Sequence, residues 1–309
     1  MRAPGSAIRE GPRGDPGRNR TGRATPCRRR LRRANDAGSG SRAGLARPQE
    51  GALDRPRGPL PTRVSDLPPL PAAYEAALDA GLRALDLGLE PAAREAIDTH
   101  ARFLLAWTAA INLTAIRDPA EVARLHIVDS LSAVPLLRGL GVRGLLDLGS
   151  GGGYPGLPLA AALPADRALL VDSVAKKVRF LDTVIRATGL ASRVHAEPAR
   201  AEALARDPSD REAWPAVTAR AVAGLGELVE VALPLVAPGG VLVAWKRAPL
   251  DDELAAAAGA LAALRAGAVT VRESGVPGLE AHRLVVVARG GPIDPRYPRD
   301  PAERRRHPL

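Results

Sequence analysis

A glycine-rich loop directly after a short apolar run constrains the fold of this chain more than any other feature. Residues 145–156 read Leu-Leu-Asp-Leu-Gly-Ser-Gly-Gly-Gly-Tyr-Pro-Gly, with five glycines among the last eight positions. Glycine adopts backbone conformations that other residues avoid, and the first N–H groups of a helix face and bind polar or anionic ligands. The pattern therefore predicts a buried strand, a tight loop and a helix, arranged around a nucleotide-like cofactor.

Downstream of this loop, apolar segments alternate with helical ones. The predicted strands are 144–148, 168–172, 193–196, 216–219 and 240–246, and the predicted helices are 158–163, 176–188, 201–205, 225–235 and 251–264. Such alternation indicates a mostly parallel, doubly wound sheet with helices on both faces. The last two strands, 268–273 and 282–289, are joined by a short connection with glycine and proline and are expected to form an antiparallel hairpin. The fold class is therefore α/β and Rossmann-like.

Upstream of the sheet, the pattern is helical. Residues 74–87 and 91–111 repeat apolar residues at spacings of three and four, and Pro91 suits the first turn of a helix. We divide the chain accordingly into four parts: a tail at 1–71, a small helical N-terminal subdomain at 72–140, a Rossmann-like domain at 141–291, and a basic C-terminal tail at 292–309.

The positive charge of the chain is concentrated in the N-terminal tail. The formal net charge is +10, but residues 1–63 hold 16 arginines and 5 acids, and the remaining residues carry a net charge of −1. The tail is rich in Arg, Gly and Pro without apolar periodicity, so we expect it to be disordered. Three interpretations stay open: an RNA-binding arm, an inert linker, or an artefact of the gene model, since Met1 is the only methionine.

Several classes of protein are disfavoured by composition. Cys27 is the only cysteine, which excludes an intrachain disulfide and a cysteine-based zinc site. The most apolar stretch, near residues 231–245, is interrupted by proline and glycine, so no membrane span is expected. We expect a cytoplasmic protein without a metal.

Two carboxylates frame the glycine loop and bear on the choice of cofactor. Asp172 ends the second predicted strand, where a carboxylate binds the hydroxyls of a ribose. Asp147 precedes the first glycine, where it would face the cationic side of S-adenosylmethionine but would repel a pyrophosphate. The spacing Gly151-x-Gly153-x-x-Gly156 also fits a dinucleotide fingerprint, so an NAD-dependent oxidoreductase remains an alternative.

The order of the predicted strands, five parallel and then a hairpin, resembles class I S-adenosylmethionine-dependent methyltransferases. Further motifs narrow this resemblance: Asn-Leu-Thr-Ala-Ile-Arg-Asp-Pro at 112–119, His-Ile-Val-Asp-Ser at 126–130, the glycine loop, Arg-Ala-Glu at 200–202, Thr-Ala-Arg-Ala-Val at 218–222, and Tyr-Pro-Arg and Pro-Leu near the end. With their spacing, they resemble the ribosomal RNA small subunit methyltransferase G family, also called glucose-inhibited division protein B. The similarity covers residues 71–309. Thr108, Ile111, Ala302 and Arg304 depart from the usual family pattern.

The resemblance implies a function and a set of cofactor contacts. The family transfers a methyl group from S-adenosylmethionine to N7 of a guanine in 16S rRNA, so the implied partner is 16S rRNA or the 30S subunit. The implied cofactor contacts are Gly149, Tyr154, Ala201, Glu202 and Arg220, to which the loop itself adds Asp147, Gly151 and Asp172. An S-adenosylmethionine-dependent enzyme with another substrate, and an RNA-binding module without activity, remain alternatives.

The substrate side of the site is less well marked. Asn112, His126, Asp129 and Arg220 are candidates for orienting the substrate, and Thr114 is a further candidate RNA contact. Helix capping or a local hydrogen bond is an equal alternative for all of them except Arg220. Basic residues that end the fifth strand or lie in the C-terminal tail are candidates for phosphate contacts: Lys246, Arg247, Arg299, Arg304, Arg305 and Arg306. Because N7 of guanine carries no proton at neutral pH, we assign no general base, and we expect a monomer.

Overall fold

The computed structural model describes residues 59–309. The predicted disorder of the tail up to residue 58, and Cys27 within it, lie outside the described residues. Residues 59–71 were predicted to belong to the tail, but they lie against the second helix of the chain instead. Leu67 is buried there, and Trp107 Nε1 donates a hydrogen bond of 2.8 Å to the carbonyl oxygen of Pro61. The tail boundary at residue 71 was therefore placed too late, because one buried leucine among prolines leaves no periodic signal.

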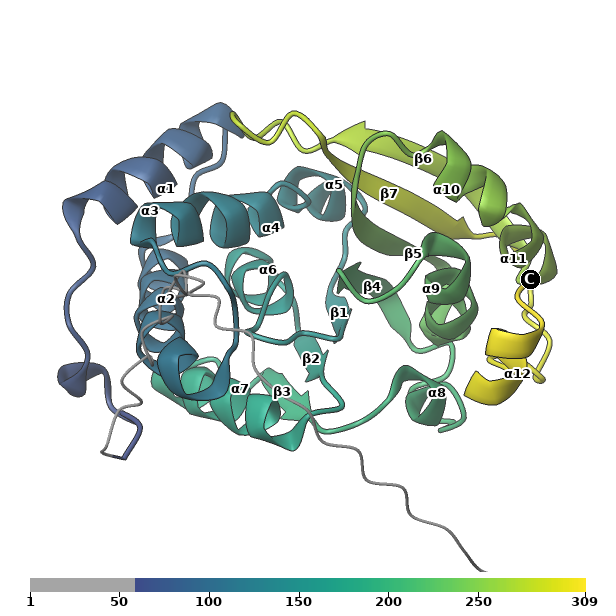
Figure 1. Ribbon diagram of the computed structural model, residues 1–309, viewed down its shortest axis with the longest axis horizontal. Coiled ribbons are helices and arrows are strands. Elements are labelled where there is room, and N and C mark those ends of the chain that lie inside the picture. The colour runs from purple at the N-terminus through teal and green to yellow at the C-terminus, as the bar shows by residue number, and fades with distance from the viewer. Residues whose placement is uncertain (1–58) are drawn as a thin grey trace, which may run out of the picture. The chain divides into compact units, whose positions relative to one another are not determined.

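A seven-stranded sheet forms the centre of the described part (Figure 1). Its strands are β1 (Gly144–Leu148), β2 (Arg167–Val171), β3 (Val194–Glu197), β4 (Trp214–Arg220), β5 (Val236–Arg247), β6 (Ala266–Glu273) and β7 (His282–Arg289). The spatial order is β3-β2-β1-β4-β5-β7-β6, with β1 to β5 parallel and β7 antiparallel to both β5 and β6. The predicted fold class is confirmed, including the terminal hairpin.

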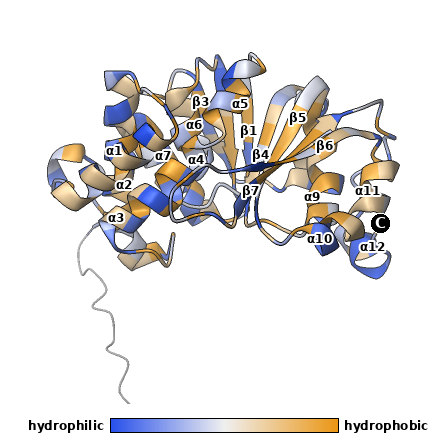
Figure 2. Cartoon of the chain, turned by 90° about the horizontal axis from the view of Figure 1, so that it is seen from above, coloured by the Kyte–Doolittle hydropathy of each residue, from blue (hydrophilic) through white to orange (hydrophobic). Residues whose placement is uncertain are grey.

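Successive side chains of a strand point to opposite faces, and in the central strands both faces are buried, whereas the edge strand β6 is mostly exposed. In β1, Leu145 belongs to one apolar core and Leu146 to the other; in β5, Val243 and Leu242 divide in the same way. Figure 2 shows the apolar strands between the two groups of helices.

The helices follow the same division. The core that contains Leu145 also takes residues from α1 (Ala72–Ala84), α2 (Pro91–Ile111), α6 (Gly156–Ala162) and α7 (Ala175–Ala187). The core that contains Leu146 takes them from α8 (Ala201–Leu204), α9 (Leu225–Ala232) with its 3-10 turn η3 (Leu233–Leu235), α10 (Asp251–Ala256) and α11 (Ala258–Ala263). The single helix predicted at 251–264 is thus two short helices, which meet at Ala257.

A helical stretch with an unusual centre lies between α2 and the sheet. It runs from α3 (Pro119–Glu121) through η2 (Val122–Val128) to α4 (Asp129–Leu131), and α5 (Val134–Gly139) follows. Its start is capped by Asp118, whose side chain accepts a hydrogen bond of 2.9 Å from Glu121 N. The central segment η2 is a π-helix, a rare form that is frequent at functional sites. The sequence predicts only an ordinary helix here.

The C-terminal segment is packed onto the sheet domain and does not form a free tail. Ile293 and Tyr297 are buried in the same core as α9, and the chain ends with α12 (Pro301–Arg306). Arg211 donates hydrogen bonds to the carbonyl oxygens of Tyr297, at 2.8 Å, and of Ala205, at 2.9 Å. This segment therefore joins α8 to the rest of the sheet domain.

Candidate functional site

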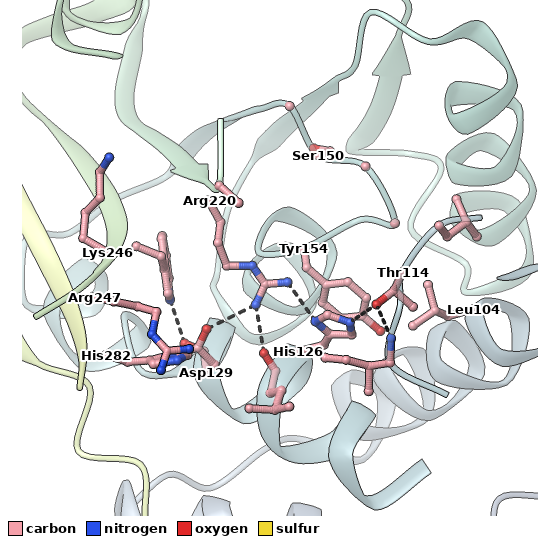
Figure 3. Close-up of a pocket in the computed structure, with 18 residues that line it drawn as sticks. Leu104, Thr114, His126, Asp129, Ser150, Tyr154, Arg220, Lys246, Arg247 and His282 are labelled. Carbon is pink, nitrogen blue, oxygen red and sulfur yellow. Dashed lines mark hydrogen bonds and ion pairs between the residues drawn. The ribbon is translucent and has the colours of Figure 1, made fainter. Parts of the chain in front are cut away.

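A cavity of about 640 Å³ opens at the carboxyl ends of the parallel strands (Figure 3). The glycine loop after β1 forms one wall, and Thr114 and His126 come from the helical region. Arg220 ends β4, and His282 begins β7, which reaches the same edge because it runs antiparallel to β5. Ligands of open α/β sheets bind at this edge.

The glycine loop has the backbone and the open space that a cofactor needs. Gly149, Gly151 and Gly153 have φ values of +68°, +57° and +89°, a left-handed conformation that side chains disfavour. A Cβ at Gly151 would approach only the Gly149 carbonyl oxygen, at 3.8 Å, so a ligand has room on that side. At Gly156 a Cβ would lie 2.6 Å from Asp147 Oδ2, so the helix α6 can start there only with glycine. These residues fit the nucleotide-like cofactor that the sequence predicts.

Asp147 is buried beneath the glycine loop, binds it through hydrogen bonds and does not line the cavity. Its carboxylate is fully buried and accepts hydrogen bonds from Thr218 Oγ1 at 2.7 Å, from Gly156 N at 3.1 Å and from Ser150 Oγ. Burial raises its pKa to about 6, although the three hydrogen bonds lower it. The sequence predicts a direct contact between Asp147 and the cationic side of a cofactor. The structure does not favour this contact, because the carboxylate already accepts hydrogen bonds from three groups of the protein.

Asp172 lies where the sequence places it, immediately after β2. Its two oxygens accept hydrogen bonds from Gly151 N at 3.0 Å and from Val174 N at 2.9 Å, and Lys177 Nζ lies 3.5 Å away. Each carboxylate oxygen can accept more than one hydrogen bond. Asp172 thus ties the loop to the second strand and keeps acceptor capacity for a ribose.

Arg220 is the centre of a polar cluster that joins β4 to the π-helix. Its guanidinium donates to Asp129 Oδ2 at 3.2 Å, to the Leu125 carbonyl oxygen at 3.1 Å and to His126 Nδ1 at 3.1 Å (Figure 3). Asp129 is almost completely buried, and its other oxygen lies 2.9 Å from His282 Nδ1. Sequence reasoning predicted that Arg220, His126 and Asp129 have roles at the site, and the structure brings all three together.

The protonation of His126 follows from its two neighbours. A guanidinium only donates, so Nδ1 of His126 is an unprotonated acceptor, and its proton lies on Nε2, 2.7 Å from Thr114 Oγ1. Burial, Arg220 and His100 together lower the pKa of His126 to about 3. The ring is therefore neutral at physiological pH.

A stack of three rings supports the loop from the helical side. Tyr154 lies between His100, with ring centres 4.4 Å apart, and His126, at 4.8 Å, and the Arg220 guanidinium lies 5.5 Å from the Tyr154 ring centre. His100 Nε2 donates a hydrogen bond of 2.6 Å to the Gly152 carbonyl oxygen, and burial lowers the pKa of His100 to about 4. Tyr154, predicted as an aromatic wall, thus packs in the loop and also lines the cavity.

Comparison with known proteins identifies the family. The model of the family described as rRNA small subunit methyltransferase G matches residues 93–280. A ribosomal RNA small subunit methyltransferase G from Roseiflexus castenholzii is 41% identical over 206 residues, which cover 66% of this chain and 87% of that protein. Its counterpart from Anaeromyxobacter sp. is 45% identical, over 62% of this chain and 87% of the relative. The chain belongs to this family. Among solved structures, an O-methyltransferase from Bacillus cereus has 16% identity and a TM-score of 0.44, over 70% of this chain and 99% of the other.

For a member of the rRNA small subunit methyltransferase G family, the pair Ala201 and Glu202 is expected near the adenine. Both residues begin α8, beyond β3, and neither lines the cavity. The Glu202 carboxylate accepts a hydrogen bond from Arg304, which also donates to the Arg299 carbonyl oxygen at 2.7 Å. Although burial opposes it, this contact keeps the pKa of Glu202 below its usual value. The Glu202 carboxylate is therefore already engaged within the protein.

The candidate RNA contacts of this family member separate into two groups. Arg299 donates to both oxygens of Glu230 at 2.8 Å, and Arg304 is buried, so both are engaged within the protein. Arg305 and Arg306 are exposed, and so is Arg247, which also lines the cavity. Lys246 lines it as well, but its Nζ is held by Glu253 at 2.6 Å.

Sequence reasoning missed two site residues and misplaced a third. His282 and Trp245 line the cavity, and Trp245 Nε1 donates a hydrogen bond of 2.8 Å to the Asp129 carbonyl oxygen. The register of β7 against β5, which pairs Arg247 with His282, would have placed His282 at the correct edge. Asn112 does not line the cavity; it is exposed and ends α2 with a φ of +49°.

Two negative findings apply to residues 59–309 alone. In this part of the chain, no three His, Cys, Asp or Glu side chains are grouped as a metal site would need. No helix within the same range is both long and apolar enough to cross a membrane.

Proposed function

We propose that this chain transfers a methyl group from S-adenosylmethionine to N7 of a guanine in the 16S rRNA of the small ribosomal subunit. The observation that carries the proposal is the glycine loop of a family member, which opens onto a cavity of about 640 Å³ between the loop and the basic edge of the sheet. Gly149, Gly151 and Tyr154 line this cavity and are proposed cofactor contacts. Asp172 is proposed at the ribose and the backbone of Ala201 and Glu202 at the adenine, at positions outside the cavity lining.

The reaction makes small demands on acid or base catalysis. When bound, the cofactor supplies an electrophilic methyl group on a sulfonium. Guanine N7 carries a lone pair without a proton at neutral pH, so no side chain has to remove one before attack. The low pKa values of His100 and His126 agree with this, because both rings are weak bases. The protein then contributes alignment and exclusion of water.

Arg220 and the π-helix are proposed to provide that alignment. The guanidinium is held by Asp129, His126 and the Leu125 carbonyl oxygen, which account for three of its five donors. Because Arg220 and the cofactor loop meet through the Tyr154 ring, the cluster fixes the distance between the substrate side and the cofactor side of the cavity.

The proposed partner is 16S rRNA, either free or in the assembled 30S subunit. Arg247, Arg305 and Arg306 are exposed and are the proposed phosphate contacts, together with Lys246 at the cavity rim. We propose that the protein acts as a cytoplasmic monomer, and that the helical region at 72–140 contributes the substrate side of the site. The ordered C-terminal segment supports α8 and also carries the exposed Arg305 and Arg306.

Two measurements on the purified protein test the proposal. Calorimetric titration with S-adenosylmethionine and with NAD should give binding of the sulfonium compound only. A single-turnover assay with a labelled methyl donor and 30S particles should then give labelled rRNA. Gly151→Asp, which fills the ligand side of the loop, should abolish both signals, whereas Gly139→Ala, where an added Cβ meets nothing within 4 Å, should preserve them. Binding of NAD alone, or absence of label on rRNA, would contradict the proposal.

A further inference from the structure

The hydroxyl group of Thr114 has both of its acceptor positions filled by the protein. The backbone N–H of Ile116 donates to Thr114 Oγ1 at 3.1 Å. The Nε2 atom of His126 lies 2.7 Å from the same oxygen. A hydroxyl has two acceptor lone pairs and one proton, so the role of the oxygen depends on which partner donates.

The direction of the His126 contact is set by Arg220. The guanidinium donates to Nδ1 of His126 and cannot accept, so the neutral ring carries its proton on Nε2 and donates it to Thr114. Burial and the Arg220 charge lower the pKa of His126, which keeps the ring in this singly protonated form. The Thr114 oxygen thus accepts two hydrogen bonds, and its own proton is left as a donor.

This donor lies at the wall of the cavity beside the glycine loop. Thr114 lines the cavity, and its neighbour Leu113 packs on Gly152, where an added Cβ would lie 3.7 Å from Leu113 Cβ. Figure 3 shows Thr114 beside Tyr154, which belongs to the loop. A ligand held by the loop would therefore meet an O–H group with no remaining lone pair to offer.

We propose that the Thr114 hydroxyl donates a hydrogen bond to the carboxylate of the amino-acid part of S-adenosylmethionine. The inference rests on the proposed function. A donor without acceptor capacity selects for an acceptor, and the carboxylate is the anionic group of this cofactor. Charged acceptors form the stronger hydrogen bonds. Thr114 lines the cavity, and its neighbour Leu113 packs against Gly152 of the glycine loop, which favours the cofactor over the RNA as the acceptor.

Paired ligands that differ only in this carboxylate test the assignment. The probes are S-adenosylhomocysteine and its decarboxylated analogue, 5′-deoxy-5′-(3-aminopropylthio)adenosine, titrated calorimetrically into wild-type protein and variants. Thr114→Val removes the hydroxyl and keeps the shape of the side chain, while Thr114→Ser restores the hydroxyl. A hydrogen bond to a charged group corresponds to about 10- to 100-fold in affinity. We expect Thr114→Val to lower the affinity for S-adenosylhomocysteine by about that factor and to leave the affinity for the decarboxylated analogue within about twofold of the wild-type value. Thr114→Ser should recover the wild-type affinity for S-adenosylhomocysteine.

The outcomes separate the inference from the proposed function. If wild-type protein binds neither adenosine ligand, the proposed function itself fails. If it binds both, but Thr114→Val weakens them equally, the hydroxyl only holds the segment in place and the inference is overturned. Unchanged binding with a lower kcat/KM for the 30S substrate would likewise overturn it, since the hydroxyl would then face the RNA. Thr188→Val makes the same change at the end of α7, where the hydroxyl donates to the Val184 carbonyl oxygen at 2.9 Å and does not line the cavity; it serves as the matched control and should leave both affinities unchanged.

Discussion

The ion pair between Arg220 and Asp129 gives the most detailed prediction. Arg220→Met removes the guanidinium but keeps much of the side-chain volume. Asp129, with 2% of its side chain exposed, would be left with His282 as its remaining side-chain partner, and His126 and the Leu125 carbonyl oxygen would lose a donor. Breaking a buried pair by removal of one partner costs about 3–5 kcal/mol, because the remaining charge stays buried. Water in the cavity compensates only part of this loss, so we expect a decrease of about 3–5 kcal/mol in the free energy of unfolding.

A double-mutant cycle isolates the pair itself. Asp129→Asn leaves Arg220 with 16% of its side chain exposed, where water replaces part of the interaction, so its expected cost is about 1–3 kcal/mol. The double variant should be less destabilised than the sum of the single changes, by about 1–3 kcal/mol.

Urea unfolding followed by far-ultraviolet circular dichroism measures all four proteins. Arg179→Met, on an exposed position of α7, is the control and should change the stability by less than about 0.5 kcal/mol. A cost below about 1 kcal/mol for Arg220→Met, or strict additivity of the two changes, would refute the role of this pair in joining β4 to α4 at the end of the π-helix.

Three further predictions concern the loop and the basic residues. Burial raises the pKa of Asp147 from 3.8 in the unfolded chain to about 6 in the folded protein, so the folded protein binds this proton more tightly. The contribution of this proton to the free energy of unfolding is fully present below about pH 4. As the pH rises through 6, the free energy of unfolding decreases by about 3 kcal/mol. Unfolding titrations at several pH values should show this loss in the wild type relative to Asp147→Asn, and parallel pH profiles would contradict it. Gly156→Ala forces a Cβ to within 2.6 Å of the Asp147 carboxylate and should weaken S-adenosylhomocysteine more than about 10-fold by calorimetry, whereas Gly139→Ala should bind as wild type; equal affinities would count against the loop geometry. Arg299→Met should lower the free energy of unfolding by about 3–5 kcal/mol without changing the salt dependence of RNA binding. Arg247→Met should reduce the salt dependence of RNA binding without changing the free energy of unfolding. Filter binding at several salt concentrations measures the salt dependence of both variants.

Much of the fold could be predicted from local patterns. The strand Gly144–Leu148 and the helix Pro91–Ile111 were predicted to the residue, since apolar runs with glycine or proline at their ends mark such elements well. The π-helix at Val122–Val128 could not be predicted in this way. Within it, the Leu125 carbonyl oxygen and the His126 ring accept hydrogen bonds from Arg220, which lies 95 positions from Leu125 in the sequence, so these contacts leave no local signal.

The same distinction holds for the site. Motif spacing predicted that the glycine loop and Arg220 face the cofactor edge, because every parallel strand ends there. The role of a carboxylate depends on what surrounds it, so Asp147 was expected to meet the ligand and instead holds the loop. His282 was missed, since only the pairing of β7 with β5 brings it to Asp129.

The central claim is methylation of guanine N7 in small-subunit rRNA. The most direct test maps methylated guanines by mass spectrometry in 16S rRNA from 30S particles treated with the protein and S-adenosylmethionine, with Gly151→Asp protein as the control. We expect one new 7-methylguanosine in the wild-type sample and none in the control. A methyl group on another atom of guanine, or on another nucleotide, would contradict it.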